Sequence, residues 1–134
     1  MRWQKGHAVR VKFLAVAVLG VALVLASACA RGGQQTIEAT TGGDVRRGAA
    51  AVARYGCGSC HIIPGISGAS GLAGPPLSGI GNRIYIGGVL QNTPENMIRW
   101  IKDPKAVDDK TVMPNVGVTQ QDAMDIAGYL YTLR

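Results

Sequence analysis

The sequence predicts an all-α domain, and three observations lead to that fold class. Three stretches place apolar side chains at the 3.6-residue period of a helix. No stretch shows a convincing strand pattern. The chain has 134 residues, 19 of them Gly, and this leaves room for one small domain beside any targeting segment. A multidomain enzyme is therefore excluded.

The first predicted helix begins after Asp44, because a carboxylate at that position is a favourable N-cap. The apolar side chains that follow fall on one stripe, with a tyrosine beside it. They are Val45, Ala49, Val52 and Tyr55.

The second predicted helix begins after Thr93, has Pro94 in its first turn and ends at Pro104. Its interior contains Met97, Ile98, Trp100 and Ile101. The third begins at Thr119, and Asp122 three residues later makes a variant of the capping box. Its apolar positions are Ala123, Ile126, Ala127, Leu130 and Leu133.

Two glycines lie inside the first and third predicted helices, at Gly48 and Gly128. A glycine inside a helix costs about 1 kcal/mol relative to alanine. A close crossing of two helices would explain both residues, and the alternative is that one of them frays a helix end.

The charge of the chain does not favour nucleic acid as a partner. The formal net charge is +6, but four basic residues precede the first apolar run, and without them the net charge is about +2. Charged residues make up 16% and hydrophobic residues 47% of the sequence, which fits neither a disordered chain nor a multispan membrane protein.

Residues 1–29 have the pattern of an export segment: a basic flank, an apolar run and then small residues. The residues before Cys29 resemble a bacterial lipobox, in which the cysteine is acylated, although Ala26 stands where leucine is usual. One alternative is an uncleaved membrane anchor, and another is cleavage after Ala28 or Ala30 that releases a soluble protein. We predict a protein on the periplasmic or other extracytoplasmic face of a bacterial membrane, lipid-anchored at Cys29.

Residues 30–43 are polar and rich in glycine and threonine, which is typical of a flexible linker. Such a segment spans roughly 20 Å and would hold a small domain near a membrane. The folded domain is therefore predicted at 44–134.

The candidate chemistry is concentrated at Cys57-Gly-Ser-Cys60-His61. A C-x-x-C pair is found in redox disulfides and in zinc sites, and C-x-x-C-H is found where a c-type haem is attached. Zinc would need further ligands, yet the other cysteine and histidine, Cys29 and His7, lie in the export segment. A thioredoxin-like site would need a βαβ setting. We therefore expect one covalent haem c, with His61 as an iron ligand.

The second iron ligand is expected to be a methionine, unless the position is open, because the chain after the export segment has no second histidine. Met97 and Met124 lie within helical patterns and read as core residues. Met113 lies in a segment without periodicity, followed by Pro114. We predict that Met113 is the ligand and that the protein is an electron carrier, not an enzyme.

These residues together resemble class I cytochrome c over 44–134. The motifs are the helix with Gly48 before Cys57-x-x-Cys60-His61, and the run Gly74-Pro75-Pro76-Leu77-x-Gly79. The resemblance implies that fold, with three main helices and loops wrapped around one covalently bound haem. It also implies roles for further residues. Pro75 would accept a hydrogen bond from His61, Arg83 and Thr111 would contact haem propionates, Trp100 would cover the distal side, and Met113 would be the sixth ligand.

The stretch from Gly74 to Pro114 is similar to haem domains associated with haem-copper oxidases. The resemblance implies a membrane-tethered carrier that passes electrons to a terminal oxidase. Two alternatives stay open. One is a haem-bearing relay subunit of a larger respiratory or dehydrogenase complex, and the other is a gas-binding haem sensor with a labile methionine ligand.

Overall fold

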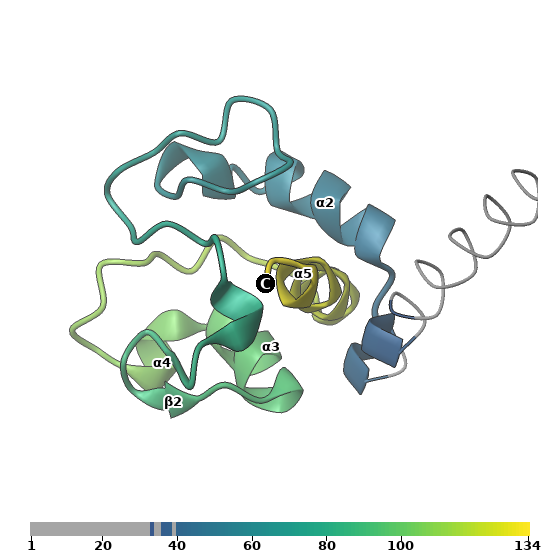
Figure 1. The fold of residues 1–134 in the computed structure, drawn as a ribbon. Helices are drawn as coiled ribbons and strands as arrows, with labels where there is room; N and C mark the ends of the chain where they lie inside the picture. The colour runs from purple at the N-terminus through teal and green to yellow at the C-terminus, as the bar shows by residue number, and fades with distance from the viewer. Residues whose placement is uncertain (1–32, 34–35, 39) are drawn as a thin grey trace, which may run out of the picture. The chain divides into compact units, whose positions relative to one another are not determined.

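Helix α5 (Gln120–Thr132) lies at the centre of the fold, with α2 (Val45–Arg54) and α3 (Pro94–Lys102) both packed against it (Figure 1). This computed structural model describes residues 33, 36–38 and 40–134. The predicted export segment, including Cys29, lies outside the described residues, as do residues 30–32, 34–35 and 39 of the predicted linker.

The three predicted helices begin at the capping residues that the sequence indicated. Asp44 accepts a hydrogen bond from the backbone N–H of Arg47 at 2.8 Å, and Thr93 accepts one from Asn96 at 3.3 Å. Thr119 accepts one from the backbone N–H of Asp122 at 3.1 Å. These side chains satisfy amide groups that have no partner in the first turn of a helix, and the predicted starts of α2, α3 and α5 are thereby confirmed.

The predicted fold class, an all-α class I cytochrome c fold with three main helices wrapped around one haem, is wrong. Strands β1 (Tyr85–Ile86) and β2 (Leu90–Gln91) pair as an antiparallel sheet. Helix α4 (Pro104–Val107) and the 3-10 helices η1 (Cys57–Ser59) and η2 (Ile80–Asn82) add to the three predicted helices. The result is a mainly helical fold with a small sheet, and it does not form the expected three-helix wrap.

The sheet was missed for a physical reason. Each strand is two residues long, too short to show an apolar–polar alternation. Residues 87–89 connect the strands, and Gly87 and Gly88 have positive φ, at 57° and 78°. Glycine adopts this left-handed backbone readily, so the connection closes as a tight turn.

The close crossing predicted from the helix glycines is confirmed at Gly48. A Cβ on Gly48 would lie 2.0 Å from the carbonyl oxygen of Asp125 on α5. At Gly128 the nearest neighbours are instead Thr41 and Gly43, which precede α2. Thr41 is itself buried, so the packed part of the chain includes the end of the predicted linker.

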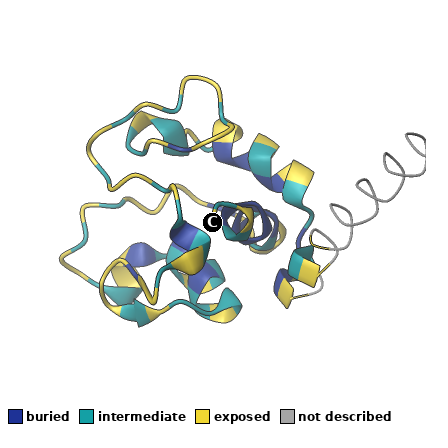
Figure 2. Cartoon of the chain, viewed as in Figure 1, coloured by how far each residue is buried: buried dark blue, intermediate teal, exposed yellow. Residues whose placement is uncertain are grey.

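The core lies around α5, which is buried along most of its length (Figure 2). Its buried apolar members come from α2, the segment after η1, η2, β1, α3, the segment before α5, and α5 itself. They are Ala51, Val52, Ile63, Ile80, Ile86, Met97, Ile101, Val118, Ala123, Ile126, Ala127, Tyr129 and Leu130. Among the described residues, no helix is long and apolar enough to span a membrane.

Candidate functional site

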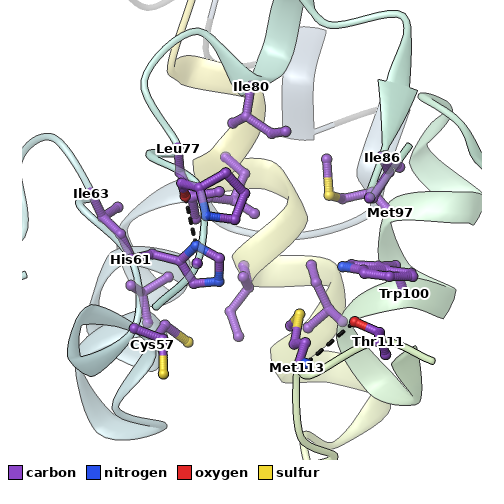
Figure 3. Close-up of a pocket in the computed structure, with 18 of the residues that line it drawn as sticks. Cys57, His61, Ile63, Leu77, Ile80, Ile86, Met97, Trp100, Thr111 and Met113 are labelled. Atoms are coloured by element: carbon purple, nitrogen blue, oxygen red, sulfur yellow. Dashed lines mark hydrogen bonds between the residues drawn. The ribbon is translucent and has the colours of Figure 1, made fainter. Parts of the chain in front are cut away.

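A cavity of about 610 Å³ opens between the segment that follows α2 and the segment that precedes α5. Its walls are mostly apolar, and its volume falls in the range of ordinary ligand pockets. Figure 3 shows Cys57 and His61 on one side, with Trp100, Thr111 and Met113 on the other. The cavity thus has a cysteine thiol and an imidazole on one wall and a methionine thioether on the opposite wall.

The structure brings together every predicted site residue that it describes. All of them line this cavity: Cys57, Cys60, His61, Pro75, Arg83, Trp100, Thr111 and Met113. The predicted lipidation site, Cys29, lies outside the described residues.

The two cysteines lie on a tight turn directly after α2. Gly56 has φ 68°, which ends the helix and redirects the chain into η1. The backbone N–H groups of Cys60 and His61 both donate to the carbonyl of Cys57, at 3.2 and 3.1 Å. Both thiols are free, and burial raises the pKa of the Cys57 thiol. The turn therefore holds two unbonded sulfur atoms and an imidazole at one wall of the cavity.

The imidazole of His61 is oriented by the loop that follows. Its Nδ1 lies 2.7 Å from the carbonyl oxygen of Pro75. A carbonyl accepts but does not donate, so Nδ1 carries the proton and the lone pair of Nε2 is free to bind a metal. Gly74 lies against the ring, since a Cβ there would be 2.3 Å from Cε1 of His61. The histidine is thus fixed in tautomer and in position.

Arg83 braces the same loop. Its guanidinium donates to the carbonyl oxygens of Pro76 and Ser78, the second at 3.2 Å. These bonds tie η2 to the loop that contains Pro75. Arg83 also lines the cavity, and its role toward a propionate stays a prediction.

The opposite wall is formed by α3 and the segment after α4. Gly87 packs over the indole of Trp100, since a Cβ on Gly87 would lie 2.6 Å from Cη2 of the ring. Thr111 Oγ1 accepts a hydrogen bond from the backbone N–H of Met113 at 3.3 Å. The structure therefore gives Thr111 a local role in shaping the backbone at Met113.

The sequence did not indicate a hydrogen-bonded pair next to Arg83, formed by Asn92 and Tyr131. The side-chain amide of Asn92 donates to the carbonyls of Ile80 and Arg83, at 2.9 and 2.8 Å. Tyr131 on α5 donates its hydroxyl to Asn92 Oδ1 at 2.8 Å, and burial raises the pKa of Tyr131 to about 12. Asn92 thereby connects α5 to η2. Through Arg83, it is also connected to the loop that contains Pro75. Its partners are distant in sequence, and no periodic pattern marks them.

A comparison with known proteins gives a partial relative. Over 79 residues, 58% of this chain, the sequence is 34% identical to cytochrome c oxidase subunit 2 of Alkalihalophilus pseudofirmus. The chain spans 22% of the length of that protein. No protein-family model matches the chain, and no solved structure matches it. The similarity links this chain to a subunit of a terminal oxidase.

Proposed function

We propose that this protein carries one covalently bound haem c and transfers single electrons, passing them to a terminal oxidase. One observation carries the proposal. The cavity has His61, with its Nδ1 hydrogen-bonded to Pro75, on the wall opposite Met113, and two free thiols beside the imidazole.

The residues present fit such a group. The cavity wall is largely apolar, as a porphyrin requires, and Arg83 supplies a positive charge at the cavity for its propionates. Cys57 and Cys60 would form the two thioether links, while His61 Nε2 and Met113 Sδ would be the axial ligands. When bound, the haem iron supplies a one-electron ferric–ferrous couple.

Residues of the protein would orient the iron ligands and determine whether the iron has an open coordination position. Pro75 keeps the His61 proton on Nδ1, so Nε2 stays available to the metal. Ligation by His61 and Met113 together would leave no vacant position for a substrate and would raise the potential. This ligand set supports an electron carrier over a catalyst or a gas sensor.

Two features of the sequence support the proposed partner and location. The similarity to cytochrome c oxidase subunit 2 supports an oxidase as the electron acceptor. The pattern of residues 1–29 supports export and attachment to the outer face of a bacterial membrane, through lipid on Cys29.

The similarity to cytochrome c oxidase subunit 2 also favours a second candidate, a haem-bearing relay subunit of a larger oxidoreductase complex. A free carrier should separate alone in mild detergent, whereas a relay subunit should co-purify with its complex.

The proposal is tested on protein matured in a host that attaches haem. Intact mass should show one added haem, and the alkaline-pyridine spectrum should be that of a haem with two thioether links. Replacing Met113 by Ala should abolish the weak long-wavelength band of a sulfur-ligated ferric haem and lower the potential, because the thioether ligand is lost. Met124→Leu, on α5 and outside the cavity lining, is the matched control and should keep the band. Bare polypeptide by mass, or a band unchanged in the Met113→Ala variant, would contradict the proposal.

A further inference from the structure

The segment that carries Met113 has few anchors of its own. In the part of the chain that the structure describes, residues 112–118 form no backbone–backbone hydrogen bond with other segments. Their two hydrogen bonds are local, from Met113 N–H to Thr111 and from Gly117 N–H to Asn115. Apart from the burial of Val118, the position of the segment depends on what holds its two ends.

The C-terminal end of this segment is held by a cluster around Asp122. Tyr55 donates its hydroxyl to Asp122 Oδ2 at 2.7 Å, and Thr119 donates its hydroxyl to the same oxygen at 2.9 Å. The Arg54 guanidinium donates to Asp122 Oδ1 at 2.6 Å and lies over the Tyr55 ring, 5.2 Å from its centre. Both carboxylate oxygens thus have charged or hydroxyl donors.

The cluster joins the two walls of the cavity. Tyr55 is the C-cap of α2 and stands two residues before Cys57 on one wall. Thr119 is the N-cap of α5 and follows the Met113 segment of the other wall. A carboxylate that bonds both residues fixes the distance between the end of one wall and the end of the other.

We infer that Asp122 is a positioning residue that holds Met113 toward the iron of the bound haem. The inference rests on the proposed function, because it concerns the ligand that function requires. Asp122 does not line the cavity and acts only through Tyr55 and Thr119. When the cluster is broken, the Met113 segment loses its fixed end and the methionine dissociates from the iron more often.

A second carboxylate on α5 provides a matched control. Asp125 also bridges to α2, accepting from Arg47 Nε at 2.8 Å and from the backbone N–H of Asp44 at 2.7 Å. These contacts lie at the start of α2, whereas the Asp122 contacts lie at its end, beside Cys57. Loss of either carboxylate weakens the α2–α5 contact, but only loss of Asp122 releases the Met113 segment.

The experiment compares Asp122→Asn and Tyr55→Phe with Asp125→Asn, each in the haem-loaded full chain. The measurements are the long-wavelength ferric band, the rate of CO binding to the reduced protein, and the free energy of unfolding in urea. CO binds where Met113 has left, so its rate reports the fraction of dissociated ligand. We expect a weakened band and about tenfold faster CO binding in the Asp122→Asn variant, since an amide nitrogen in place of Oδ2 cannot accept from Tyr55 and Thr119. Tyr55→Phe keeps the ring and removes only the hydroxyl that donates to Asp122. It therefore tests the same hydrogen bond if the Asp122→Asn variant does not fold.

Each outcome decides between distinct claims. Asp125→Asn should lower stability while the band and the CO rate stay as in the wild type. If Asp122→Asn or Tyr55→Phe lowers stability but leaves both readouts unchanged, the cluster is merely structural and the inference is overturned. A wild-type protein that lacks the band would instead overturn the proposed function, and the inference with it.

Discussion

At the scale of single residues, the site depends on how closely backbone approaches the His61 ring. Gly74 leaves no room for a side chain, because a Cβ would lie 2.3 Å from Cε1 and 2.6 Å from Nδ1 of His61. Gly74 also donates its N–H to the carbonyl of Cys60 at 2.8 Å, so its backbone has little freedom to move away. A glycine is therefore required there for space and not for its φ angle.

Replacing Gly74 by Ala should displace the imidazole and weaken its hydrogen bond to Pro75. We expect a loss of about 1–3 kcal/mol in the free energy of unfolding, the range found when a packed site is overfilled. The absorption spectrum of the haem-loaded variant should also change. Urea unfolding and spectroscopy measure both effects. Ser78→Ala, an exposed position in the same loop, should change neither.

The site residues predicted from sequence all line one cavity, and their roles toward a haem stay predictions, whereas most of the hydrogen bonds around them were not predicted. Local motifs singled out residues that lie on both cavity walls, because the Cys57 to His61 spacing and the isolated Met113 are visible in a short window. The bonds from Arg83 to two backbone carbonyls were not predicted. Such bonds depend on the path of a glycine- and proline-rich loop, which carries no periodic signal.

At the scale of elements, helices with capping residues were predictable and short elements were not. Asp44, Thr93 and Thr119 marked helix starts because each side chain satisfies amides of its own first turn. The β1–β2 pair and η2 were missed because their two or three residues give no period. Asn92 was missed as well, since its partner Tyr131 is brought near only by tertiary packing.

At the crossing of α2 and α5, a Gly48→Ala substitution sets helix propensity against steric overlap, and the sign of the change in unfolding free energy shows which effect is larger. By helix propensity alone, Gly48→Ala should stabilise the protein by about 1 kcal/mol. The added Cβ would instead meet the Asp125 carbonyl at 2.0 Å and the Tyr129 Cβ at 2.9 Å, and both neighbours are fixed within α5. We expect net destabilisation of about 2 kcal/mol or more, measured by urea unfolding. A more stable variant would show that the helices separate at little cost.

At the scale of the whole molecule, two carboxylates of α5, Asp122 and Asp125, bridge to α2, and the carboxylate of Asp44 caps α2; all three make stability depend on pH. Burial raises the pKa of Asp125, but hydrogen bonds from Arg47, Asp44 and Gln121 outweigh it and hold that pKa below its usual value. The Arg47 backbone N–H lowers the pKa of Asp44, and hydrogen bonds from Tyr55 and Thr119 lower that of Asp122.

Because these pKa values are lowered on folding, the ionised forms stabilise the fold above the unfolded pKa of about 4. That contribution is lost as the pH falls through the folded values. We expect the free energy of unfolding to be nearly constant from about pH 5 to 7 and to fall below about pH 4. Asp125→Asn should be less stable at neutral pH, by about 2 kcal/mol, and should show a shallower decline in acid. An equally steep acid decline in that variant would assign the effect to other groups.

The contact between α2 and α5 also bears on the order in which the protein matures. It joins residues 45–54 to residues 120–132, so it is strongly non-local, and closing the loop between them costs chain entropy before any packing is gained. That loop contains both thiols, the imidazole and the methionine of the cavity. If the protein carries the proposed haem, the cysteine turn would be open to the machinery that attaches it while the two helices are apart. The packing of α2 against α5 would then close the cavity, so the proposed function predicts that attachment comes before closure.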